Sequence, residues 1–172
     1  MTILGIISDT HGQLEPTKRA RKIFEEQGVS IVIHCGDIGS EEVVRAFEGI
    51  ETHFVYGNMD GENDALRRAA TETGNTLHGW QGAFERCGRK ICFMHGHQSE
   101  RFEVELCSEH WDLLCIGHTH FPLLQQFGET TLLNPGALHR VPIPRVAIVR
   151  LPELEVQNFA LDEISLFPTE EG

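Results

Sequence analysis

The chain has 172 residues, of which 40% are hydrophobic and 23% are charged, values typical of one soluble globular domain. No apolar run approaches the roughly 20 residues that cross a bilayer, and the first residues lack the pattern of a signal peptide. The net charge of −12, from 14 Lys and Arg against 26 Asp and Glu, disfavours broad electrostatic capture of nucleic acid. We therefore expect one domain over residues 1–172, frayed at about 168–172, with no membrane partner and no extended nucleic acid partner.

Short apolar runs alternate with helix-like segments in the first half of the chain. We expect strands over residues 3–7, 30–34 and 52–56, and helices over residues 16–27, 41–47 and 63–71. Alternation of this kind predicts parallel strands joined by helical crossovers.

From about residue 75 the pattern changes to a succession of short strands with turn residues between them. The expected strands cover residues 76–78, 83–86, 90–94, 113–116, 123–127, 130–133, 146–151 and 155–160. One helix is expected over residues 99–110. These are too many strands for one small sheet, so we predict an α/β fold of two packed sheets flanked by helices.

The chain also has five cysteines and ten histidines. The cysteines form no C-x-x-C pair and mostly lie in apolar runs, which predicts reduced core thiols in a cytoplasmic protein. Ten histidines is a high number for this length, and imidazole both binds metals and titrates near neutral pH. The histidines that occur in close pairs therefore indicate where a site should be sought.

Potential metal ligands follow five of the predicted strands directly, often beside a glycine. These stretches are Asp9-Thr10-His11, Gly36-Asp37, Gly57-Asn58, His95-Gly96-His97 and Gly117-His118-Thr119-His120. Because ligands of open α/β sheets bind at the carboxyl ends of strands, we expect these five strand ends to converge. In an extended chain residues i and i+2 point the same way, which would place Asp9 with His11, and His118 with His120.

The candidate donor set consists of two aspartates, one asparagine and four or five histidines, without a thiolate. Mixed imidazole and carboxylate ligation suits Mn, Fe, Zn, Co or Ni better than Ca or a structural zinc. Seven candidate ligands suffice for two metals if one carboxylate bridges them. Taken singly, Asp9-Thr10-His11 and Gly57-Asn58 are also compatible with ordinary turns, and a mononuclear zinc site made by the histidine pairs remains an alternative.

These stretches resemble the calcineurin-like metallophosphoesterases, whose pattern is D-x-H, G-D, G-N-H-D/E, H-G-H and G-H-x-H. Order and spacing match from residue 3 to residue 120, and the compact length is similar to the small phosphodiesterase subfamily related to the retromer scaffold subunit. The resemblance implies a two-sheet αββα sandwich with mixed sheets and flanking helices. It also implies one metal held by Asp9, His11, Asp37 and His120, and a second held by Asp37, Asn58, His95 and His118, with Asp37 bridging.

The sequence departs from the family pattern at Met59, where many members have a histidine that protonates the leaving group or binds the phosphate. A thioether does neither at useful strength. Asp60, which would orient that histidine, is then either a turn residue or a support of the site. His97 becomes the candidate for substrate contact or proton donation, with an exposed loop histidine as the alternative, so the expected catalytic residues are His97 and Asn58.

The resemblance implies a phosphoric ester hydrolase with two divalent transition metals, Mn foremost and Fe, Zn, Ni or Co as alternatives. A metal-bridging hydroxide would attack a small phosphodiester, and Met59 favours substrates with good leaving groups over alkyl monoesters. A non-catalytic metal-binding scaffold of the same fold is the alternative, although every expected ligand position is occupied. The sequence leaves open the physiological substrate, the native metal and whether copies of the chain form a homo-oligomer.

Overall fold

Strand β1 (Thr2–Ile7) is apolar from Ile3 onwards because helices cover one of its faces and a second sheet covers the other. Leu4 and Ile6 point into the core between the sheets, whereas Ile7 packs in the core under the helices. Gly5 lies beneath Phe24 of α1 (Leu14–Glu26), and a Cβ atom at Gly5 would come within 2.9 Å of that ring. A strand buried on both faces is typical of a parallel α/β sheet.

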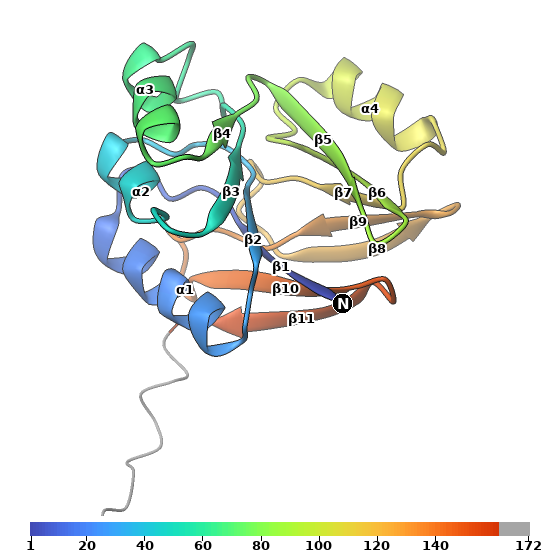
Figure 1. Ribbon diagram of the computed structural model, residues 1–172. Coiled ribbons are helices and arrows are strands. Elements are labelled where there is room, and N and C mark those ends of the chain that lie inside the picture. The colour runs from blue at the N-terminus through green and yellow to red at the C-terminus, as the bar shows by residue number, and fades with distance from the viewer. Residues whose placement is uncertain (162–172) are drawn as a thin grey trace, which may run out of the picture.

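The computed structural model describes residues 1–161, in which β1 is a central strand of the first of two sheets. Its order is β11 (Glu155–Ala160), β10 (Arg145–Leu151), β1, β2 (Ile31–His34), β3 (Glu51–Phe54) and β4 (Thr76–Leu77). Strands β1 to β4 run parallel, whereas β10 is antiparallel to both of its neighbours. Helices α1, α2 (Glu41–Arg45) and α3 (Asp64–Glu72) lie along the outer face of this sheet (Figure 1).

The second sheet has five strands and is also mixed. Its order is β5 (Gln81–Arg86), β6 (Arg89–Met94), β7 (Leu113–Cys115), β9 (Thr130–Asn134) and β8 (Leu123–Phe127). Strands β6, β7 and β9 are parallel, and the two edge strands pair antiparallel. Helix α4 (Ser99–Cys107) covers its outer face on the opposite side of the molecule from α1 to α3 (Figure 1).

The predicted fold class, two mixed sheets packed between helices, is confirmed. Every predicted strand and helix is present, with bounds that mostly differ by one or two residues. The largest difference is at the end of α4, which stops at Cys107, three residues earlier than expected. Helix α2 stops at Arg45, two residues early, because residues 46–49 form turns closed by the left-handed Gly49. The predicted fraying at 168–172 lies outside the described residues.

The two sheets bring their strand ends to one edge of the molecule, where the loops that follow β1, β2, β6 and β7 bond to one another through their backbones. The N–H of Asp9 donates to the carbonyl of Gly36 (3.0 Å), and the N–H of Gly117 donates to the carbonyl of His95 (3.1 Å). The N–H of His118 donates to the Asp9 carboxylate (3.1 Å), which joins the loop of one sheet to the loop of the other. This edge therefore holds the predicted site residues.

Candidate metal centre

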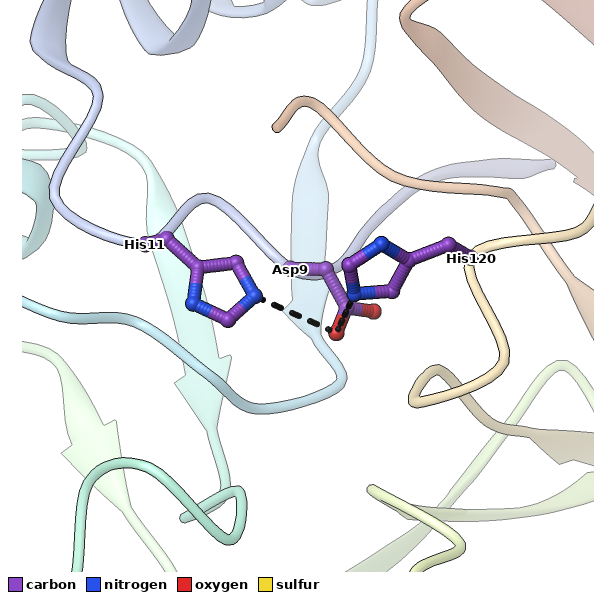
Figure 2. A group of neighbouring side chains, drawn as sticks. All are labelled: Asp9, His11 and His120. Atoms are coloured by element: carbon purple, nitrogen blue, oxygen red, sulfur yellow. Dashed lines mark ion pairs between the residues drawn. The ribbon is translucent and has the colours of Figure 1, made fainter. Parts of the chain in front are cut away.

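Nitrogen and oxygen donors from loops of both sheets converge on the carboxylate of Asp9. Its Oδ1 atom lies 3.1 Å from Nε2 of His120, 3.8 Å from Nε2 of His11 and 3.9 Å from Nε2 of His95. Figure 2 shows the rings of His11 and His120 directed at this oxygen from opposite sides. Asp9, His11 and His120 thus form a set of donor atoms that all lie within 4.8 Å of one another.

A second set of donors, Asp9, Asp37 and His95, meets the same 4.8 Å criterion and is buried throughout. The Oδ2 atom of Asp37 lies 3.3 Å from Nε2 of His95 and 3.6 Å from Nε2 of His11. Asp37 therefore lies close to one histidine of each set, His11 of the first and His95 of the second. Asp9 is a member of both sets. Asn58 joins the second set through Oδ1, 3.0 Å from Nε2 of His95.

His118 stands beside these donors without belonging to either set. Its ring centroid lies 5.1 Å from that of His95 and 6.1 Å from that of His97. The structure therefore brings all seven predicted ligand residues to one place, six of them through direct donor contacts and His118 through its ring.

Several polar atoms of this cluster lack a hydrogen-bond partner or face another acceptor, which indicates a cation-binding site. Oδ1 of Asp9 and Nε2 of His11 are buried and have no hydrogen-bond partner. Nδ1 of His95 contacts the carbonyl of Cys35 (2.8 Å) and must donate to it, so in the neutral ring Nε2 is a lone-pair acceptor. That lone pair faces the acceptor oxygens of Asn58 and Asp37. Buried acceptors that face one another are unfavourable until a positive charge lies between them, which either a proton on His95 or a metal ion supplies, so the residues present fit a metal centre.

The carboxylate of Asp37 and the imidazole of His95 also influence each other's protonation. Burial raises the pKa of Asp37, but the contact with His95 and the N–H of Met59 outweigh burial and bring it down to about 2. Burial lowers the pKa of His95, yet the carboxylates of Asp37 and Asp9 outweigh burial and raise it above its ordinary value. Asp37 is therefore a carboxylate at neutral pH, in the form that ligates metals.

The backbone at the predicted ligands differs from the expected extended conformation. Five of them have positive φ: Asp9 (53°), His11 (45°), Asp37 (53°), His118 (66°) and His120 (63°). The expectation that i and i+2 share a face of an extended chain is therefore wrong for Asp9 with His11 and for His118 with His120. Left-handed residues other than glycine are uncommon and cluster at functional sites, where the surrounding contacts hold them in place.

Side chains and backbone groups behind the ligands fix their orientation. Ser8 Oγ donates to Oδ2 of Asp9 (2.6 Å), and the N–H of Met59 donates to Oδ1 of Asp37 (2.9 Å). Met59 itself is 68% exposed, so its contribution to the site comes from its backbone.

Asp60 links two loops that carry ligands. Its carboxylate accepts hydrogen bonds from the N–H groups of Gly57 (2.8 Å), Ile38 (3.1 Å) and Gly39 (3.0 Å). The first belongs to the loop of Asn58 and the other two to the loop of Asp37. Of the two interpretations that the sequence left for Asp60, these bonds favour a support of the site.

His34 is packed behind the ligands and supports them through hydrogen bonds to their loops. The N–H of Gly36 donates to its Nδ1 (3.2 Å), so Nε2 carries the proton and donates to Thr10 Oγ1 (2.9 Å), which in turn donates to the carbonyl of Ile38 (2.9 Å). Complete burial is the main reason that the pKa of His34 falls to about 3. Neutral His34 thereby ties the loop of Asp9 to the loop of Asp37.

Sequence reasoning found no partner for His139, which the structure places against the site. Its ring centroid lies 5.2 Å from that of His11, because the N–H of Leu138 donates to the carbonyl of Asp9 (3.3 Å) and draws this loop inwards. The turn at Asn134-Pro135-Gly136 was the available signal, since it follows a strand parallel to β7.

His97, the predicted proton donor, lies next to the ligand cluster and outside it. Its ring centroid is 5.4 Å from that of His95 and 5.6 Å from that of Trp80. Its Nδ1 is buried without a hydrogen-bond partner. Burial, followed by the neighbouring rings of His95 and His118, lowers the pKa of His97 below its ordinary value.

Comparison with known proteins gives the family of this chain. Residues 1–153 match the calcineurin-like phosphoesterase superfamily domain, so the chain belongs to this superfamily of phosphate ester hydrolases. A phosphodiesterase of Methanocaldococcus jannaschii is 30% identical over 92% of this chain and 99% of its own length. The phosphodiesterase YfcE of Escherichia coli is 28% identical over 84% of this chain and 82% of its own length. These relatives fit the small phosphodiesterase subfamily.

Solved structures show the same fold. An archaeal phosphodiesterase superposes with a TM-score of 0.86 at 29% identity, covering 92% of this chain and 99% of the other. A Vps29 variant from Entamoeba histolytica superposes with a TM-score of 0.68 at 20% identity, covering 94% of each chain. Within residues 1–161, no helix combines the length and apolar character needed to cross a membrane.

Proposed function

We propose that this chain is a dinuclear metal-dependent phosphodiesterase that hydrolyses a small phosphodiester with a good leaving group. The observation that carries the proposal is the pair of carboxylate and imidazole donor sets that meet at Asp9, in which Oδ1 of Asp9 and Nε2 of His11 are buried without a hydrogen-bond partner. The names of the relatives in Methanocaldococcus jannaschii and Escherichia coli support hydrolysis of diesters.

In this proposal two sets of residues hold the two metals. Asp9, His11, Asp37 and His120 hold the first, whereas Asp37, Asn58, His95 and His118 hold the second. Manganese suits this mixture of carboxylate and imidazole, and Fe, Zn, Co and Ni are compatible with it. When bound, such a metal pair activates water near neutral pH and stabilises charge on the transferring phosphoryl group.

The remaining roles fall to side chains of the protein. Two divalent ions bring four positive charges against the two carboxylates of Asp9 and Asp37, so an anionic ester is attracted locally although the chain carries −12. Asn58 orients the phosphoryl group beside His95. Because Met59 replaces the family's histidine, His97 takes over contact with the leaving group or supplies its proton.

The first test is metal stoichiometry, measured by mass spectrometry after manganese is loaded into the metal-free protein. We expect two ions per chain in the wild type. Asp37→Ala should lose both because its carboxylate lies between the two donor sets. The matched control is Asp64→Ala, which removes an exposed carboxylate from the first turn of α3. A single ion that survives Asp37→Ala would instead indicate a mononuclear site made by the histidine pairs.

The second test is a substrate panel with manganese present. Bis(4-nitrophenyl) phosphate should turn over faster than alkyl monoesters, because no histidine at position 59 assists a poor leaving group. Equal or faster hydrolysis of alkyl monoesters would contradict the diester preference. Two bound metals without hydrolysis of any ester would favour the scaffold alternative.

A further inference from the structure

A surface hollow of about 500 Å³ lies beside the candidate metal centre at the start of α4. The chain lines it with five consecutive residues: His97, Gln98, Ser99, Glu100 and Arg101. Three of them, His97, Gln98 and Arg101, also line a smaller adjoining depression together with His95 and Trp80. The hollow therefore shares His97 with a depression that His95 of the cluster also lines.

Arg101 is the cationic residue of this hollow, and its guanidinium is free. It is exposed, and it forms no hydrogen bond or ion pair with any residue in the part of the chain that the structure describes. Several other arginines of this acidic protein are instead held in ion pairs: Arg45 contacts Glu41 and Glu72, and Arg89 contacts Asp112. A free guanidinium presents planar paired donors that suit a carboxylate or a phosphate.

The position of His97 connects the hollow to the reaction. In the proposed function His97 contacts the leaving group, and its ring both neighbours the ring of His95, at 5.4 Å between centroids, and lines the hollow. A substituent on the leaving group that extends past His97 therefore enters the hollow, where Gln98 and Ser99 add hydrogen-bonding groups and Arg101 adds positive charge.

We infer that this hollow is a specificity site for an anionic group, a second phosphate or a carboxylate, carried by the leaving alcohol of the substrate. Arg101 is the residue that selects for it. The inference rests on the proposed function, because it assigns the leaving group to the side of His97. Glu100 lies on the same rim and weakens the local positive potential, so the selection depends on direct contact with the Arg101 guanidinium.

The experiment compares two diesters that differ by one charge on the leaving group, 4-nitrophenyl methyl phosphate and 3-carboxy-4-nitrophenyl methyl phosphate. With manganese-loaded wild type, kcat/KM for the carboxylated probe should exceed that for the neutral probe by about tenfold, as one charge-assisted hydrogen bond provides. In Arg101→Gln the ratio should fall to about one, mainly through KM of the carboxylated probe. Arg101→Lys should keep part of the preference, and Glu100→Gln should increase it.

Arg68→Gln is the matched control, since Arg68 is an exposed arginine on α3 outside the candidate metal centre. It should leave both probes unchanged. Hydrolysis of both probes with the same ratio in wild type and Arg101→Gln would overturn the specificity site and leave the proposed function intact. Hydrolysis of neither probe by protein that holds two manganese ions would overturn the proposed function, and this inference with it.

Discussion

Asp60 shows how one carboxylate serves a site that it does not enter. The family pattern pairs this position with a histidine that the chain lacks, and here the carboxylate accepts three backbone N–H groups instead. Those bonds fix the relative positions of the loops that carry Asp37 and Asn58. Mutation of residues that orient ligands in this way typically lowers metal affinity or activity by about 10- to 100-fold.

We predict that Asp60→Asn lowers manganese affinity by about 10- to 100-fold, because an amide places a donor where N–H groups need an acceptor. Titration calorimetry on the metal-free protein measures this affinity, with thermal unfolding of the same samples as a check on folding. Asp64→Asn, an exposed carboxylate on α3, should change neither. If Asp60→Asn binds manganese with unchanged affinity, Asp60 is only a turn residue and does not support the site.

The loops that follow the strands approach one another closely because glycines, which have no side chain, occupy the points of contact. A Cβ atom at Gly117, after β7, would collide with Ser8 Oγ and lie 2.7 Å from the Asp9 carboxylate. A Cβ atom at Gly36 would lie 2.9 Å from the His95 ring. Glycine at these positions lets the loops of the two sheets touch, and the donor sets depend on that contact.

Gly117→Ala should therefore damage the site more than the fold. The added methyl group pushes against Ser8 and Asp9, so we expect a destabilisation of about 1–3 kcal/mol, typical of overpacking, together with loss of high-affinity manganese binding. Gly61→Ala is the control, because Gly61 is also in a loop after β3 but has open space around it. It should lose about 1 kcal/mol from its left-handed backbone and keep its metals. Equal metal affinity in the two variants would contradict the role of the close approach.

The same elements show what the sequence could and could not predict. The order of strands and helices was predictable because apolar periodicity and turn residues are local signals, as in the apolar run of residues 3–7. The backbone at Asp9 and His118 was not, because left-handed φ in aspartate or histidine is imposed by tertiary contacts. His139 was missed for a related reason, since only the folded loop brings it to His11.

For the whole molecule, the facing acceptors predict that metal binding stabilises the native state. The unfolded chain lacks the preformed site, so each manganese ion at 100 times its dissociation constant should add about 2.7 kcal/mol of stability. For a chain of this size that corresponds to a rise of roughly 5–10 °C in Tm for each ion. Differential scanning calorimetry with and without manganese measures it.

The control for this prediction is calcium, which prefers all-oxygen sites and should produce a smaller shift. Asp37→Ala should show no manganese response at all. An equal rise in Tm with both ions, or a manganese response that persists in Asp37→Ala, would indicate binding to the acidic surface instead.

The left-handed backbone at five proposed ligands has a consequence for how such a chain changes over generations. Each of these aspartates and histidines occupies a conformation that glycine adopts without strain. Replacing His118 by glycine, for example, relieves local strain and at the same time abolishes a metal ligand. In a descendant that is no longer selected for activity, we therefore expect replacement of these ligands by glycine to relieve backbone strain. Such a descendant would keep the fold after it has lost the activity.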